Sequence, residues 1–69
     1  MATYTAILRH EPDSWIGWIE EIPGVNSQGA TRQELLENLR SALGEAIEMN
    51  REAARAEAGP VFEEAKLAV

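Results

Sequence analysis

EEIPGVNSQGATRQELLENLR, residues 20–40, decides the fold, because it turns a strand-rich first third of the chain into a helix-rich second half. Pro23 and Gly24 predict one turn and Gly29 predicts a second. Thr31 is followed three residues later by Glu34, the capping-box spacing that marks the start of a helix. We therefore expect a turn, a short extended segment, a second turn and a helix start within this stretch.

Upstream, the pattern is that of a β-hairpin. Apolar and β-branched residues alternate over 2–9 and again over 15–19, which predicts two strands. Pro12 and Asp13 lie between them and suit the centre of a turn, so the two strands are expected to pair antiparallel. Residues 25–28 leave room for a brief third strand between the two later turns.

Downstream, the period changes to that of a helix, beginning at Arg32. The apolar positions recur at three- and four-residue steps, as in a helix lying on a sheet: Leu35, Leu36, Leu39, Ala42, Leu43, Ala46 and Ile47. Gly44 lies inside this helix at a cost of about 1 kcal/mol relative to alanine, for which either a close packing contact or chance is the explanation. Large apolar residues are missing after Asn50, and Gly59-Pro60 is expected to end the helix.

The last segment, residues 62–69, alternates again, with Ala65, Leu67 and Val69 on one side. We interpret it as a fourth strand that returns beside the first strand and parallel to it. The predicted fold class is α+β, in the order β-β-β-α-β, with one helix packed on a small mixed sheet. A single domain is expected over residues 1–69.

Size and composition limit how this domain is stabilised. A core in a chain of 69 residues rarely supplies more than about 3–5 kcal/mol. The sequence has no cysteine and one histidine, so neither disulfides nor a structural metal is expected to add to it. Self-association into a dimer or tetramer is the remaining ordinary route.

The net charge and the hydropathy limit which partners and which cellular compartment are expected. The net charge of −6 disfavours phosphate backbones and suits a basic partner, although solubility alone explains it equally well. The chain has no apolar run of the ~18–20 residues that a membrane span needs, and its N-terminus lacks the pattern of a signal peptide. A soluble, cytoplasmic protein is expected.

Chemistry-bearing motifs are scarce. His10 has no cysteine to activate, and we interpret it as a surface histidine. Glu11, Asp13, Glu20 and Glu21 could gather at a two-metal site, but Glu20 and Glu21 are adjacent on a strand end and point to opposite faces, so a solvated charge run is favoured. No phosphate loop or basic patch with aromatic residues occurs. The sequence indicates a binding protein rather than an enzyme, with no cofactor and no direct nucleic-acid binding.

The two tryptophans are the most informative side chains. Trp15 and Trp18 are three residues apart on the second predicted strand, so they point to opposite faces of the sheet. At most one of them lies beneath the helix. The other is either a partly exposed surface residue or an apolar anchor for a partner, and we expect the anchor.

The chain also resembles the N-terminal domain of HicB-type antitoxins over roughly residues 3–50. The resemblance is carried by an acidic residue, an aliphatic residue and Pro-Gly, then Ser-Gln-Gly, then Thr-x-x-Glu-Leu-Leu-Glu-Asn-Leu-Arg-x-Ala, within residues 21–42. Tyr-Thr-Ala-Ile-Leu at 4–8 and Trp-Ile-Gly-Trp-Ile at 15–19 strengthen it. It implies a partial ribonuclease-H-like fold.

The resemblance also implies a function. Family members bind HicA, a small basic toxin that cleaves mRNA, and cover its active site. This chain would then be the inhibitory half of a toxin–antitoxin pair, in a short form lacking a DNA-binding domain. The alternative is a stand-alone, homo-oligomeric HicB-like domain without a toxin. The expected partner contacts are the two tryptophans and five glutamates: Trp15, Trp18, Glu20, Glu21, Glu37, Glu45 and Glu48.

Overall fold

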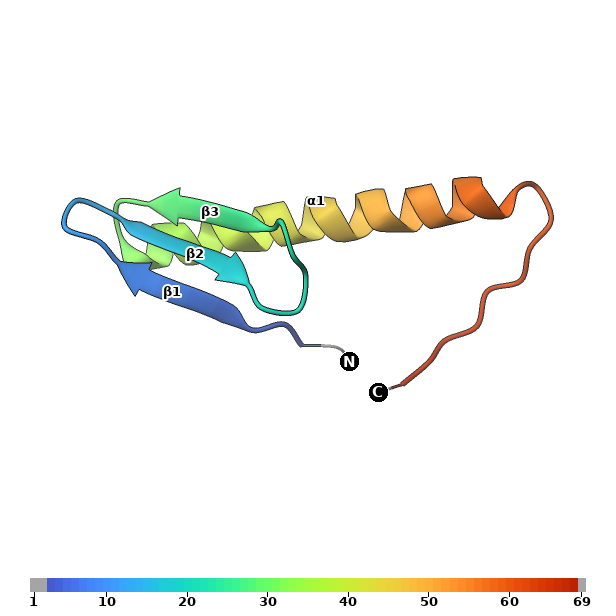
Figure 1. The fold of residues 1–69 in the computed structure, drawn as a ribbon, viewed down its shortest axis with the longest axis horizontal. Coiled ribbons are helices and arrows are strands. Elements are labelled where there is room, and N and C mark those ends of the chain that lie inside the picture. The colour runs from blue at the N-terminus through green and yellow to red at the C-terminus, as the bar shows by residue number, and fades with distance from the viewer. Residues whose placement is uncertain (1–2, 69) are drawn as a thin grey trace.

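The computed structural model describes residues 3–68 as a three-stranded sheet with one long helix across one of its faces (Figure 1). The elements follow one another as β1 (Ala6–His10), β2 (Trp15–Ile19), β3 (Asn26–Gly29) and α1 (Arg32–Ala58). The strand order is β1-β2-β3, and both pairings are antiparallel. The predicted α+β class and the β-β-β-α order are confirmed.

Tight turns set the register of the sheet. The N–H of Glu11 donates to the carbonyl oxygen of Ser14 at 2.8 Å and closes the first hairpin, so that Ile7 lies opposite Trp18. Between β2 and β3 the chain turns through Gly24, whose φ of 90° lies in the left-handed region that glycine adopts at little cost. The predicted Pro-Gly turn therefore joins two adjacent antiparallel strands.

Both ends of α1 lie where the sequence predicts them. Thr31 is the N-cap, and its Oγ1 accepts the N–H of Glu34 at 3.1 Å. Gly59 follows the last helical residue with a φ of 84°, and its N–H donates to the carbonyl oxygen of Ala56 at 3.3 Å. The cap and the terminal glycine thus fix a helix of 27 residues.

The core lies between the sheet and the first half of α1. Its buried apolar residues are Ile19, Val25, Leu35 and Leu39. The helix approaches closely at Gly17, where an added Cβ would lie 3.1 Å from Leu39 Cδ1. Beyond Ile47 every residue of α1 is exposed. The core is therefore small and occupies one end of a molecule that measures 51 × 23 × 16 Å.

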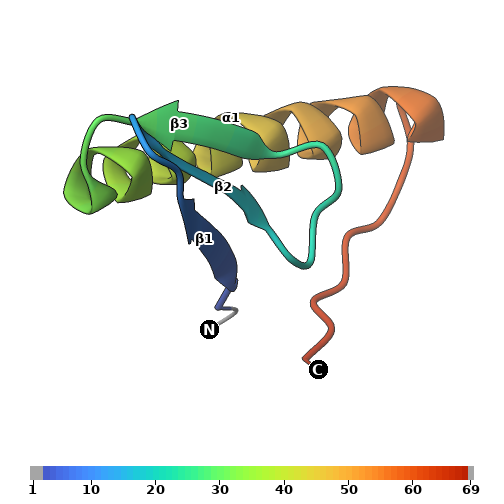
Figure 2. The same cartoon turned by 60° about the vertical axis from the view of Figure 1, so that its left-hand side comes forward.

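The predicted fourth strand is wrong for residues 62–68, which form no strand, and Val69 lies outside the described residues. The sheet described is accordingly antiparallel and not mixed. The long helix gives the physical reason, because its exposed part, residues 48–58, carries the chain ~16 Å past the last core contacts. The tail then turns back below the helix toward the side on which β1 begins, without pairing with it (Figure 2), and is held to the helix by an ion pair between Arg55 and Glu64 at 3.0 Å.

Over residues 3–68, no helix has both the length and the apolar character that crossing a membrane requires.

Candidate partner-binding surface

The sheet face turned away from α1 is the most distinctive exposed surface, and we call it the outer face. It carries one apolar and one polar set of side chains from the three strands: Ile7, Arg9, Ile16, Trp18, Asn26 and Gln28. Ile7 and Trp18 are direct cross-strand partners, 36% and 39% exposed, although both are large apolar side chains. Ile16 is half-buried beside them. The surface has the composition of a protein interface, an apolar centre with a polar rim.

A shallow groove runs along this face between β2 and β3. Ile16 and Trp18 line one side of it, and Asn26, Ser27 and Gln28 line the other. Asn26 lies opposite Trp18 in the ladder, and Gln28 lies opposite Ile16. Amide side chains therefore stand next to the apolar centre, where they can donate and accept hydrogen bonds at its edge.

The two tryptophans point to opposite faces, as the sequence predicts. Trp15 lies on the side of α1, half-buried against the core, and its ring stacks on His10 with centroids 4.4 Å apart. Trp18 lies on the outer face. Of the two, Trp18 is the one that a partner seated on the outer face would contact, whereas Trp15 is occupied by packing within the domain.

Glu20 and Glu21 follow β2 in the turn at one end of the sheet. The Glu20 N–H donates to the carbonyl oxygen of Thr5 at 2.9 Å, which extends the ladder by one pair. The Glu21 carboxylate accepts the Thr5 N–H at 2.7 Å, and this hydrogen bond lowers the pKa of Glu21. Glu21 therefore stabilises the entry to β1, and alternation places Glu20 on the same face as Trp18.

The three helix glutamates named in the sequence analysis lie elsewhere. Glu37, Glu45 and Glu48 are exposed on α1: Glu37 lies opposite the buried Leu35 and Leu39, and Glu45 and Glu48 lie further along the helix. They face away from the sheet, on the opposite side of the two layers from the outer face. The structure thus brings Trp18 and Glu20 onto one surface and separates both from the helix glutamates.

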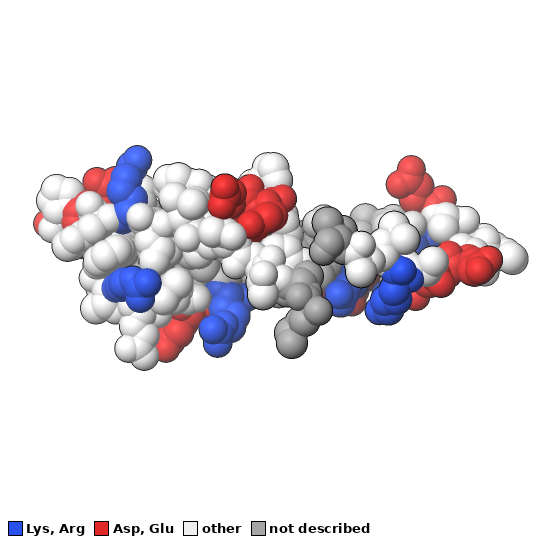
Figure 3. Space-filling model, turned by 90° about the horizontal axis from the view of Figure 1, so that it is seen from below, with Lys and Arg blue, Asp and Glu red and all other residues white. Residues whose placement is uncertain are grey.

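Charge is dispersed over the described surface. Figure 3 shows acidic and basic side chains interspersed on the view from below, without a continuous patch of one sign. Some acids are already paired: Glu11 lies 2.6 Å from Arg9, and Glu48 lies 3.8 Å from Arg51. The net charge of −6 therefore acts as an overall field and not through one acidic patch.

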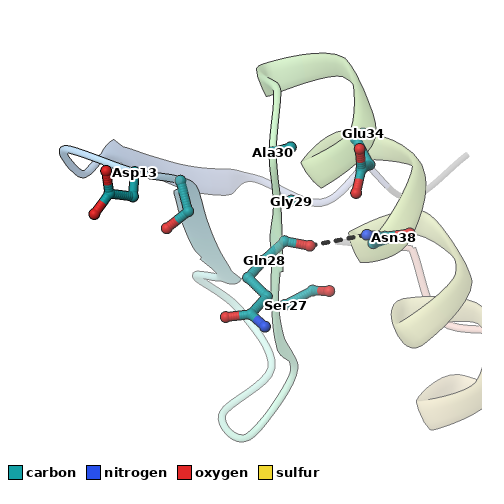
Figure 4. A pocket seen from close by; sticks show the side chains of 8 residues that line it. Asp13, Ser27, Gln28, Gly29, Ala30, Glu34 and Asn38 are labelled. Atoms are coloured by element: carbon teal, nitrogen blue, oxygen red, sulfur yellow. Dashed lines mark hydrogen bonds between the residues drawn. The ribbon is translucent and has the colours of Figure 1, made fainter.

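A second hollow lies where β3 meets the start of α1 (Figure 4). Asn38 donates from Nδ2 to the carbonyl oxygen of Gln28 at 2.8 Å across it. Asp13 and Glu34 stand on opposite sides of the opening (Figure 4). The lining contains no histidine, cysteine, lysine or arginine. This hollow is open and polar, and the interaction it shows is the attachment of the helix to β3.

The four acidic residues considered for a two-metal site do not come together. Glu11 and Asp13 lie at the hairpin end of β2, and Glu20 and Glu21 lie at its other end, about 17 Å away for a five-residue strand. Among residues 3–68, no group of three or more histidine, cysteine, aspartate or glutamate side chains could hold a metal ion.

Of the six residues of the outer face, only Trp18 is among those expected at the site from the sequence; its apolar neighbours Ile7 and Ile16 are not. Alternation places Ile16 beside Trp18 on one strand. The hairpin register then adds Ile7 across the ladder, and that register becomes visible only with the structure. Searches against protein-family models, curated proteins and solved structures return no match to this chain.

Proposed function

We propose that this chain is a binding protein of the HicB antitoxin type, which neutralises a small basic mRNA-cleaving toxin by covering its active site. The observation that carries the proposal is the exposure of Trp18 in an apolar centre with Ile7 and Ile16, on a sheet face that no described element covers. Exposed tryptophan in such a setting is the residue type most enriched among energetic anchors of interfaces. The outer face is accordingly the proposed contact surface.

The arrangement of elements supports the same proposal. Three antiparallel strands followed by a helix across one face make up most of the partial ribonuclease-H-like fold that the resemblance implies. We include that finer fold assignment in the proposal. The fourth strand of that fold is missing from residues 62–68, so the support comes from the β-β-β-α part.

Electrostatics favours a basic partner. The net charge of −6 attracts a cationic protein over several ångströms and speeds its association. Glu20 is the acidic residue next to the apolar centre, and it is exposed. A basic toxin seated on the outer face would meet Trp18 at its centre and Glu20 at its rim.

The first test substitutes the proposed anchor. The protein encoded by the neighbouring gene is co-purified with this chain, and their dissociation constant is measured by calorimetry. Trp18→Ala is expected to weaken binding by about 30-fold, a loss of about 2 kcal/mol. Met49→Ala is the matched control, because Met49 is 67% exposed on α1 and outside the outer face, and it is expected to change the constant less than about 2-fold. Equal effects of the two substitutions, or a neighbouring gene without a small basic product, would contradict the proposal.

The second test uses charge. Glu20→Lys is expected to slow association by several-fold at low salt, because it reverses a charge at the rim of the contact surface. Glu48→Lys makes the same change in net charge on the far side of the molecule and is expected to act less. If stopped-flow measurements show a larger effect for Glu48→Lys, the result would contradict the outer face as the contact surface and indicate the helix instead.

A further inference from the structure

On the edge of β1 that faces away from β2, the backbone N–H and C=O groups pair with no other described strand. The N–H of Glu20 donates to Thr5 and that of Glu11 to Ser14, so odd-numbered residues of β1 face β2. In an antiparallel ladder the alternate residues point their N–H and C=O groups the other way, which here means Ala6, Leu8 and His10. Within residues 3–68, no strand pairs with these groups. The edge can therefore accept one more strand.

The two edges of the sheet differ in how they are protected. At β3 the outward carbonyl of Gln28 is occupied by Asn38 of α1 at 2.8 Å, and the helix lies mainly over β3 and β2. β1 has no proline, no lysine and no covering element, which are the usual means of blocking an edge. Ala6 and Leu8, on its inner side, are only half-buried. The open edge thus coincides with an incompletely covered part of the core.

The tail, residues 61–68, has the features of a strand that could pair with the open edge of β1. It is extended and exposed, with Val61 and Leu67 each 89% exposed and Phe62 48% exposed. Ala65 and Leu67 alternate with Glu64 and Lys66. Apolar residues that alternate in this way are typical of a strand with one buried face. The exposure of these residues leaves that face without a partner.

The helix determines where the tail is presented. Residues 48–58 overhang the core by ~16 Å, so the tail starts beyond the end of its own sheet (Figure 1). An overhanging helix followed by an exposed tail with the alternation of a strand, and an open sheet edge on the same chain, is an arrangement from which two copies can exchange an element.

We propose that the tail of one chain pairs as an edge strand along β1 of a second copy, with the exchange made reciprocally in a two-fold dimer. Ala65 and Leu67 would then cover Ala6 and Leu8 on the inner side. Glu64 would lie on the side of Arg9, giving an opposite-charge pair across the new ladder. Each chain would gain a fourth strand for its sheet, and the inference does not depend on a toxin.

A second copy fits the observations better than the tail of the same chain. Within residues 3–68 no strand pairs with either the edge or the tail, and the exposed Arg55–Glu64 ion pair attaches the tail to α1. Among residues 3–68 the core buries four apolar residues, which leaves the isolated domain with little stability, and a reciprocal exchange would add apolar burial twice per dimer. The reciprocal exchange would also cover part of the overhanging helix, residues 48–58.

The test is a complementation experiment by sedimentation at micromolar concentration. A chain ending at Pro60 lacks the tail. Ala6→Pro blocks the edge, since the Ala6 N–H points outward and proline is tolerated at the first residue of a strand. The unaltered chain is expected to be dimeric. Each variant alone is expected to dissociate on the order of 100-fold more readily, and a mixture of the two is expected to form a heterodimer through the one remaining edge and tail.

Hydrogen exchange provides the second measurement and does not depend on the proline variant folding. The amides of Ala6, Leu8 and His10 are expected to be protected in the unaltered chain and to lose that protection when the tail is removed. A dimer that persists without the tail would overturn the proposal in favour of direct pairing between two β1 edges. A monomer with protected amides would overturn it in favour of the tail on its own sheet, and a monomer with unprotected amides would leave the edge unpaired and also overturn it. None of these outcomes depends on toxin binding, so this proposal and the antitoxin proposal can fail separately.

Discussion

Gly17 and Gly44 are two glycines in regular elements with opposite surroundings. A Cβ at Gly17 would lie 2.7 Å from the carbonyl oxygen of Ile7, a backbone atom that cannot move away without disturbing the ladder, whereas one at Gly44 would meet nothing within 4 Å. Gly17→Ala is therefore expected to destabilise the fold by about 2 kcal/mol through overpacking. Gly44→Ala is expected to stabilise it by about 1 kcal/mol, and both are measured by urea unfolding. Equal effects of the two substitutions would contradict the close packing around Gly17.

The hydrogen bond from Thr5 to Glu21 predicts a pH dependence at the entry to β1. The pKa of Glu21 is lowered from 4.5 because its carboxylate accepts the Thr5 N–H. A carboxyl whose pKa is lowered by folding contributes stability above its unfolded pKa, and that contribution is lost as pH falls through the folded pKa. In NMR titrations the Thr5 amide shift is expected to change with a midpoint below 4.5, and Glu21→Gln is expected to remove the transition. A Thr5 amide that does not respond to pH in the unaltered chain would contradict this bond.

The helix start is the element that the sequence specifies most completely. Thr31 Oγ1 accepts the N–H of Glu34, so Thr31→Ala leaves a helix N–H without its side-chain partner and is expected to cost about 1 kcal/mol. Ser41→Ala is the matched control, because Ser41 is exposed in the helix interior and its removal is expected to be neutral or slightly stabilising. Thermal unfolding followed by circular dichroism measures both. A cost for Ser41→Ala equal to that for Thr31→Ala would show that the cap contributes nothing specific.

Elements with local signals could be predicted from the sequence, and elements that depend on distant contacts could not. The hairpin, the turn at Gly24 and both ends of α1 follow from residues within a few positions of each feature. The tail has the alternation of a strand, but a strand needs a neighbour, and residues 62–68 pair with none of the strands described. No local pattern contains that information. The explanation for Gly44 is likewise decided only by the structure, where no packing contact requires it.

The candidate site was predicted in part for the same reason. The opposite orientation of Trp15 and Trp18 follows from the two-residue period of a strand, and the structure confirms it. The inclusion of Ile7 depends on the register between strands, and the exclusion of Glu37 and Glu48 from the outer face depends on how the helix packs on the sheet. Periodicity assigns faces within one element, and packing decides which faces of different elements meet.

At the scale of the whole molecule, the two layers present different surfaces to solvent. The outer face of the sheet offers an apolar centre around Trp18, and the exposed helix carries glutamates on the other side. The overhang extends from one end of the sheet, and the tail turns back below it (Figure 2). The proposed toxin would bind the outer face, and the proposed exchange of tails would use the free edge of β1, whose Ile7 and Arg9 belong to that face. An exchanged tail would therefore extend the outer face at its rim.

The most direct test of the central claim, that the outer face covers the active site of a basic ribonuclease, is an RNA-cleavage titration. The product of the neighbouring gene, the proposed toxin, is held at a fixed concentration and this chain is added in increasing amounts, with Trp18→Ala as a parallel series. The account predicts that cleavage stops at one equivalent of the unaltered chain and continues at one equivalent of Trp18→Ala. Cleavage that continues with the unaltered chain in excess would contradict it.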